Sequence, residues 1–233
     1  MCGRSSLTVT EKELEARFNA SFYSEDLERY NPIPNYNMAP SQKLPVITNT
    51  DPDHINLYRW GLIPFWAKDE KIGYKMINAR SETAAEKPAF RQALQKRRCI
   101  WPIDGYYEWI KKGKEKIPYR VTSNQQAIFS IAGLWESWKD ETGETVHSFT
   151  VLTRASTPTM MFLHHRMPVL LPREIERDWL EESIDPTVFL EELPLFGTDE
   201  LHVYRVSKQV NNVRNNHKEI IEEVEDLEQG ELF

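Results

Sequence analysis

The sequence contains little cysteine and no long hydrophobic run. Cys2 and Cys99 are the only cysteines in its 233 residues, which excludes a disulfide scaffold, and no Cys-x-x-Cys pair indicates a zinc site. No apolar stretch approaches the roughly 18 residues of a membrane-spanning helix. Residues 1–6 are polar and unlike a signal peptide. We therefore expect a cytoplasmic protein with no membrane partner and no bound metal.

Aromatic residues, in contrast, are plentiful. The chain has 7 Trp, 9 Tyr and 10 Phe, and 40% of its residues are hydrophobic, which is enough to form a sizeable core and excludes a disordered chain. No internal repeat and no Gly/Ser-rich or Pro-rich linker divides the sequence. These features predict one domain over residues 1–217, followed by an acidic tail over 218–233.

The negative charge is concentrated in two segments. The net charge is −7, but residues 174–200 carry −9 and residues 218–233 carry −6, so the remaining 190 residues carry +8. Residues 87–120 contain ten basic and three acidic side chains. A nucleic-acid surface is therefore permitted on the basic part, although the same charges also fit a solvated face.

Strands dominate the predicted secondary structure. A capping box at Thr10 and Glu13 predicts a helix, residues 87–98 predict another, and Thr157-Pro158 predicts a short helix running toward His164. The sequence KKGK at 111–114 predicts a hairpin turn. Strands are expected over 44–48, 55–60, 99–103, 106–110, 119–122, 128–135, 148–153, 169–171 and 201–206. The predicted fold class is α+β, a strand-rich single domain of curved antiparallel or mixed sheets, barrel-like and flanked by helices.

Cys2 offers the most distinctive chemistry. Removal of Met1 leaves a cysteine with both a free α-amine and a thiol, whose reference pKa values are about 8 and about 8.5, so both are partly nucleophilic at neutral pH. Such a pair traps an aldehyde twice, because the amine condenses to an imine and the thiolate then closes a thiazolidine ring. Taken alone, Cys2 also fits an incidental residue after the initiator.

Three further segments carry candidate site residues. Asn78 and Arg80 share a face of an extended segment, where the amide suits an amine or carbonyl and the guanidinium suits a phosphate. Glu108 lies among aromatic residues in the sequence. Burial among them would raise the pKa of its carboxyl toward neutrality, which suits general acid–base catalysis. The adjacent His164 and His165 supply a titrating imidazole, and spacing does not decide between the two. Singly, each segment also fits a structural role: an Asn turn with a surface Arg–Glu pair, a surface glutamate, or a packed histidine pair.

Four aromatic residues lie close to basic residues in the sequence. Trp60, Phe65, Trp66 and Trp109 are of the kind that stacks on unpaired bases. Packing in the core is the alternative for each of them.

Together these segments resemble one family, the SRAP family of SOS response-associated peptidases that process abasic sites. The matching segments are 1–4 (MCGR), 36–40 (YNMAP), 60–61 (WG), 78–83 (NARSET), 104–109 (DGYYEW), 164–168 (HHRMP), 206–207 (VS) and 211–213 (NNV). The resemblance runs in order from residue 1 to about residue 217 and shows no break in the catalytic pattern.

The resemblance implies a covalent trap for abasic sites in single-stranded DNA that protects the lesion during the DNA damage response. Cys2, exposed when self-cleavage or an aminopeptidase removes Met1, would condense with the ring-opened deoxyribose aldehyde. Asn78 would hold the amine and the sugar, Glu108 would move protons, and His164 would assist ring opening. An abasic-site lyase activity is left open.

The resemblance also implies residues that bind DNA. Arg4, Arg80 and Arg166 would contact phosphates, and Trp66 and Trp109 would support the flanking bases. We expect no cofactor, a monomer, and association with the nucleoid when DNA is bound.

Two other functions fit parts of the sequence. An N-terminal-nucleophile glutamine amidohydrolase would use Cys2 to attack a glutamine amide, with its own α-amine as base. A noncatalytic single-stranded DNA-binding module would use the aromatic and basic residues, with Cys2 inert, and its binding would be reversible and salt-sensitive.

Overall fold

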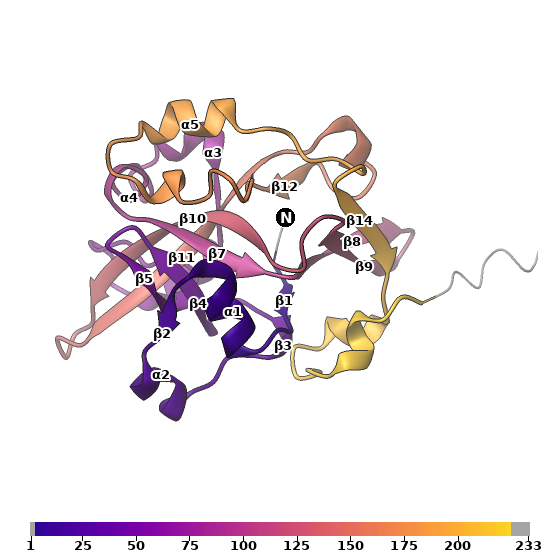
Figure 1. Ribbon diagram of the computed structural model, residues 1–233, viewed down its shortest axis with the longest axis horizontal. Helices are drawn as coiled ribbons and strands as arrows, with labels where there is room; N and C mark the ends of the chain where they lie inside the picture. The colour runs from indigo at the N-terminus through magenta and orange to yellow at the C-terminus, as the bar shows by residue number, and fades with distance from the viewer. Residues whose placement is uncertain (1–2, 225–233) are drawn as a thin grey trace, which may run out of the picture.

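The computed structural model describes residues 3–224 and consists mainly of strands (Figure 1). The strands are β1 (Ser5–Leu7), β2 (Ser21–Phe22), β3 (Asn35–Met38), β4 (Lys43–Thr48), β5 (Asp51–Trp60), β6 (Asn78–Arg80), β7 (Arg98–Ile103), β8 (Gly105–Lys112), β9 (Glu115–Ser123), β10 (Phe129–Lys139), β11 (Thr145–Ala155), β12 (Arg166–Pro168), β13 (Leu170–Leu171) and β14 (Leu201–Arg205). The helices are α1 (Glu11–Phe18), α2 (Ser24–Arg29), α3 (Ser81–Ala84), α4 (Arg91–Lys96) and α5 (Pro186–Glu192). Short 3-10 helices are η1 (Glu70–Lys75), η2 (Pro158–Met160), η3 (Asp178–Leu180), η4 (Lys208–Asn211) and η5 (Lys218–Ile221).

Five strands close into a barrel. β11 pairs antiparallel with β10 and parallel with β5, and β10, β7, β4 and β5 pair with one another in that order, so the hydrogen-bonded ring is complete. Closure removes the exposed edges that an open sheet would present. The predicted fold class, a strand-rich α+β domain with a barrel-like sheet, is confirmed.

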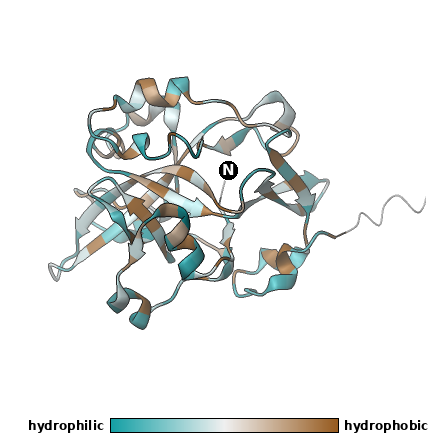
Figure 2. Cartoon of the chain, in the orientation of Figure 1, coloured by the Kyte–Doolittle hydropathy of each residue, from teal (hydrophilic) through white to brown (hydrophobic). Residues whose placement is uncertain are grey.

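The core of the barrel is aromatic. Trp60 and Trp101 lie with their ring centroids 4.7 Å apart, and Phe149 lies 5.5 Å from Trp101; all three are fully buried. Hydrophobic segments follow the barrel strands and α5, whereas α2 is mostly hydrophilic (Figure 2). Cys99 is also fully buried here, and burial raises the pKa of its thiol, so this cysteine is not a nucleophile in the folded protein.

A second sheet lies beside the barrel and has the order β14-β9-β8-β1-β3 (Figure 1). Its central strand β1 pairs antiparallel with both β8 and β3, with Ser5 opposite Tyr106 on one side and Met38 on the other. The N-terminal strand is therefore enclosed by segments more than 30 and 100 residues away, and its position is set by tertiary contacts.

Most predicted elements are confirmed, with shifted ends. The capping box of Thr10 and Glu13 begins α1, and the KKGK hairpin joins β8 to β9 through Gly113 at φ 62°. The prediction of a helix over 87–98 is wrong in its bounds, since α4 begins at Arg91 and ends at Lys96. Residues 88–90 form a turn before the helix, and Arg98 already belongs to β7. The predicted helix after Thr157 is the single turn η2, with Pro158 at its first position.

The residue after the barrel strand β5 must be glycine, because of the backbone conformation and close packing at Gly61. Its φ of 118° is a conformation that residues with side chains rarely adopt, and a Cβ there would lie 2.6 Å from the carbonyl oxygen of Gly73. No helix within residues 3–224 is both long and apolar enough to span a bilayer.

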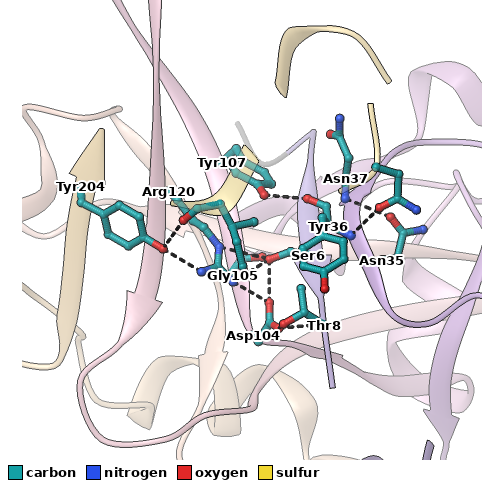
Figure 3. A network of polar contacts seen from close by, with 12 residues as sticks. Ser6, Thr8, Asn35, Tyr36, Asn37, Asp104, Gly105, Tyr107, Arg120 and Tyr204 are labelled. Carbon is teal, nitrogen blue, oxygen red and sulfur yellow. Dashed lines mark hydrogen bonds and ion pairs between the residues drawn. The ribbon is translucent and has the colours of Figure 1, made fainter. Parts of the chain in front are cut away.

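A buried polar network holds β1 in the second sheet (Figure 3). The carboxylate of Asp104 accepts hydrogen bonds from Ser6 Oγ (2.6 Å), from the N–H and Oγ1 of Thr8 (2.6 and 2.5 Å) and from Arg120 Nη2 (2.8 Å). Arg120 also donates to Ser6 Oγ (2.9 Å) and to the hydroxyl of Tyr204 (2.7 Å). Both charged side chains are only 8% exposed. The network therefore joins β1, β9 and β14 around one desolvated ion pair.

Substitution of Asp104 by Asn should strongly destabilise the fold. The variant leaves the Arg120 cation buried without its carboxylate, and breaking a buried pair from one side typically costs about 3–5 kcal/mol. Urea denaturation of the purified variant measures this free energy of unfolding. The control Asp53→Asn changes an exposed residue on β5 and should stay within about 0.5 kcal/mol of wild type. A loss below 1 kcal/mol for Asp104→Asn would contradict the role given to the network.

Candidate active site

One cavity of about 560 Å³ gathers several of the residues singled out in the sequence. It is lined by Arg4, Glu108, Trp109, Lys111, Lys116, His164 and Asn211. These residues come from the N-terminal strand, the β8–β9 hairpin, the loop before β12 and the C-terminal segment. The cavity therefore forms where distant parts of the chain meet.

The N-terminal strand leads toward this cavity. The amide of Tyr107 donates to the carbonyl of Arg4 (2.9 Å), and Ser5 pairs with Tyr106, so the antiparallel register places Gly3 opposite Glu108. Cys2, the predicted nucleophile, lies outside the described residues. The register nevertheless directs the N-terminal end of β1 along β8 toward Glu108.

Glu108 is buried on β8. The residue is 4% exposed, and burial raises the pKa of its carboxyl above the ordinary range. A carboxyl with a raised pKa retains its proton closer to neutral pH and serves as an acid as well as a base. The predicted burial of Glu108 among aromatic residues is confirmed.

His164 faces the same cavity from the loop before β12. Its Nδ1 lies 2.9 Å from the amide nitrogen and 3.0 Å from the carbonyl oxygen of Arg166, so the main chain of Arg166 orients the ring in either tautomer. Burial, with a smaller effect from the nearby Arg166 cation, lowers the pKa of His164, so the imidazole is neutral at pH 7. His165 stacks on it with ring centroids 4.2 Å apart and is exposed. The cavity lining thus includes His164, and His165 packs behind its ring.

Asn78 and Arg80 lie on β6, next to the barrel strand β11. Asn78 pairs with Val151 and Arg80 with Thr153, in parallel register. Thr153 is also opposite Pro168 of β12, so β6 and β12 flank the same point of β11. Arg80 is exposed, and its charge contributes to the lowered pKa of His165 after the larger effect of His164. β6 therefore lies alongside the histidine pair, outside the lining of the cavity.

Arg166 is held by a carboxylate that the sequence analysis gave no site role. Its Nη1 and Nη2 donate to the two oxygens of Glu82 (2.6 and 2.8 Å), and Nη2 also donates to the carbonyl of Thr153 (2.6 Å). The Arg166 guanidinium holds the pKa of Glu82 below its usual range. Arg166, which was predicted to contact a phosphate, is therefore a buried cation whose guanidinium is already positioned by the carboxylate of Glu82.

Arg4 and Trp109 are fixed by the C-terminal segment. Arg4 Nη1 donates to Asn37 Oδ1 (2.6 Å) and to the carbonyl of Val210 (2.7 Å), and its guanidinium lies 5.9 Å from the Trp109 ring centroid. Trp109 Nε1 donates to Asn211 Oδ1 (2.7 Å). Arg4 and Trp109 are thus both oriented toward one side of the cavity.

Nothing in the sequence indicated that four residues lie at or near the cavity, and one predicted site residue, Trp66, lies away from it. Glu82, Lys111, Lys116 and Asn211 were quoted only as parts of longer segments, because nothing in their spacing reveals a contact across the fold. Trp66 is 49% exposed in the loop after β5 and does not belong to the cavity lining. Within residues 3–224, no three His, Cys, Asp or Glu side chains cluster in a way that could hold a metal.

Comparisons with known proteins identify the family of the chain. The profile of the SOS response associated peptidase (SRAP) family matches residues 1–213. The chain is 41% identical over 225 residues to the abasic site processing protein YoqW of Bacillus subtilis, covering 95% of this chain and 99% of YoqW. It is 31% identical to the abasic site processing protein YedK of Escherichia coli, covering 96% of this chain and 100% of YedK.

A solved structure and a vertebrate relative extend the comparison. A crystal structure of a protein from Bacteroides thetaiotaomicron superposes with a TM-score of 0.87 at 29% identity, covering 96% of this chain and 100% of the other. The abasic site processing protein HMCES of Xenopus tropicalis is 31% identical over 94% of this chain and 77% of its own length.

Replacing Glu108 by Gln should change how stability depends on pH. Because the folded-state pKa of Glu108 is raised, the folded protein binds more protons than the unfolded chain above about pH 4, and its stability falls as pH rises through the folded pKa. Gln does not titrate. The unfolding free energy of Glu108→Gln relative to wild type should therefore rise between pH 4 and pH 8, by about 1.4 kcal/mol per unit of pKa shift.

Urea denaturation at four pH values measures this difference. Glu141→Gln, at an exposed hairpin position, is the matched control and should show no such trend. A flat or falling difference for Glu108→Gln would show that the carboxyl is not desolvated.

Proposed function

Because the chain belongs to the SRAP family, we propose that it processes abasic sites in single-stranded DNA by trapping their aldehyde covalently at Cys2. The observation that carries the proposal is the cavity that brings Glu108 and His164 together beside the strand leading back to the N-terminus. Abasic site processing is also the activity for which the relatives YoqW, YedK and HMCES are named.

The first step is opening of the sugar. In the closed hemiacetal, the bond between the ring oxygen and C1′ breaks, the C1′ hydroxyl loses its proton, and the ring oxygen gains one. A neutral imidazole suits both transfers, because Nε2 can accept the proton of the C1′ hydroxyl and then donate it to the ring oxygen while Nδ1 stays bonded to the main chain of Arg166. The lowered pKa of His164 supports this role.

The next steps join the aldehyde to Cys2. After removal of Met1, the α-amine attacks C1′, and the resulting hydroxyl leaves as water with a proton from Glu108, which forms a protonated imine. The Glu108 carboxylate then takes the thiol proton, the sulfur bonds to C1′, and the electrons of the C=N double bond return to nitrogen, which keeps its hydrogen. One water is lost overall and no redox partner is needed. The raised pKa of Glu108 supports its use as both acid and base.

Basic and aromatic residues near the cavity are suited to holding the strand. Arg80 is exposed, whereas Arg166 and Arg4 are oriented by Glu82 and Asn37, so their guanidinium groups need little reorganisation to meet a phosphate. Trp109 offers a fixed ring to a flanking base. Asn78 and Trp66 complete the proposed set, contacting the sugar and a flanking base respectively.

Mixing the protein with a single-stranded oligonucleotide that carries one abasic site should yield an adduct that survives denaturing electrophoresis. Its mass should equal the protein without Met1 plus the oligonucleotide less one water. Cys2→Ala should abolish the adduct, and Glu108→Gln should slow its formation by about 10²–10⁴-fold, the usual contribution of a general acid–base residue. Glu141→Gln and an intact oligonucleotide are the controls.

Two outcomes would replace the proposal. Absence of an adduct from protein that lacks Met1, together with Cys2-dependent glutamine hydrolysis, would indicate the amidohydrolase. Salt-sensitive, reversible DNA binding that is unaffected by Cys2→Ala, again without an adduct, would indicate the noncatalytic module.

A further inference from the structure

The hairpin beside the cavity carries two lysines that face each other. Lys111 of β8 and Lys116 of β9 are direct cross-strand partners, both are exposed, and both line the cavity that contains Glu108 and His164. Lys114 lies at the tip of the same hairpin. The exposed end of the β8–β9 hairpin is therefore strongly cationic on the side of the site.

This pairing is unfavourable for folding. Like charges directly opposite in an antiparallel pair destabilise it, and neither Lys111 nor Lys116 forms an ion pair with any residue in 3–224. The neighbouring Glu115 pairs with Lys208 (3.2 Å), so the one acid of the hairpin end is already used. An anion supplied by a ligand would offset the repulsion.

The position of the pair indicates which anion it meets. Side chains alternate along a strand, so Trp109 and Lys111 lie on one face of β8, two residues or about 6.6 Å apart along the strand. The Trp109 ring is oriented by Asn211 and borders the cavity. A base stacked on Trp109 would place a phosphate of its own strand near Lys111 and Lys116.

We propose that Lys111 and Lys116 form a subsite for a backbone phosphate of single-stranded DNA, adjacent to the nucleotide that stacks on Trp109. The subsite rests on the proposed function. Lysine suits it, because an ammonium group is a point charge on a flexible stem and meets a phosphodiester without a fixed orientation. The pair anchors the strand outside the cavity while the lesion enters it.

Equilibrium binding tests the subsite separately from the chemistry. Fluorescence anisotropy with a single-stranded oligonucleotide lacking an abasic site is measured between 50 and 200 mM salt for wild type, Lys111→Gln/Lys116→Gln, and the control Lys12→Gln/Lys96→Gln. The control removes the same charge from exposed positions in α1 and α4. Losing the contact to one phosphate should lower the salt slope by about 0.7, so the affinity deficit of the double variant shrinks about 2.6-fold over this range.

A neutral phosphate locates the contact. Oligonucleotides with one methylphosphonate at successive positions should weaken wild-type binding at several positions. When the methylphosphonate replaces the phosphate that meets the lysines, the affinity of the Gln double variant should not fall further. The affinity of Lys111→Arg/Lys116→Arg should fall as much as that of wild type. Equal losses in wild type and the Gln variant at every position would overturn the proposal, as would a salt slope equal to that of the control.

The crosslinking assay separates this inference from the proposed function. With abasic DNA, the double variant should need more DNA to reach half-maximal rate but keep the rate at saturation. If wild type forms the adduct and the double variant needs no more DNA than the control to reach its half-maximal rate, the lysine subsite alone is overturned. Wild type that binds DNA with the lysine-dependent slope but forms no adduct would overturn the covalent chemistry alone.

Discussion

The buried ion pair of Asp104 and Arg120 is the interaction on which the site depends. β1 has three residues, too few for strand pairing alone to fix it firmly, yet it must hold the start of the chain beside Glu108. The carboxylate of Asp104 binds Ser6 and Thr8, and the guanidinium of Arg120 binds the same Ser6 from the other side. Gly105 is part of the arrangement, because a Cβ there would lie 2.6 Å from Arg120 Nε. The ion pair thus converts a short terminal strand into a fixed support for the site.

Burial gives the cavity a different electrostatic character at its floor and at its rim. The same desolvation raises the pKa of Glu108 and lowers that of His164, so both groups favour their neutral forms. The rim, in contrast, carries Lys111 and Lys116. The rim would therefore attract a polyanion, while Glu108 and His164, the groups proposed to transfer protons, favour their uncharged forms. Such a division suits a substrate whose charge lies in its backbone and whose reactive carbon is uncharged.

Local sequence patterns predicted much of the fold. Alternation and turn residues located most strands of the barrel, and the capping box of Thr10 located α1. The closure of the barrel was not visible, because it depends on the pairing of β11 with β5, which joins residues 89 apart. The predicted helix over 87–98 is longer than α4, because the pattern of basic and apolar residues continues into the first residue of β7.

The candidate site was predicted to a similar extent. Glu108 and His164 could be identified because the resemblance names them and because aromatic neighbours predict burial. The pairing of Arg166 with Glu82 joins residues 84 apart, and Asn211 reaches Trp109 across 102 residues, so neither contact has a signature in spacing. Lys111 and Lys116 were expected in a hairpin, but that they face each other at the cavity is a consequence of strand register.

The contacts of β1 have a consequence for how the protein is made. Ser6 meets Asp104 across 98 residues, and Arg4 meets Val210 across 206. At a synthesis rate of about 5–20 residues per second, the second contact cannot form until roughly 10–40 s after the N-terminal residues have been polymerised. Throughout that interval the start of the chain emerges from the ribosome before its enclosing strands and the C-terminal segment exist. Factors that act on nascent chains therefore encounter Arg4 and Ser6 before the partners of these residues have been synthesised.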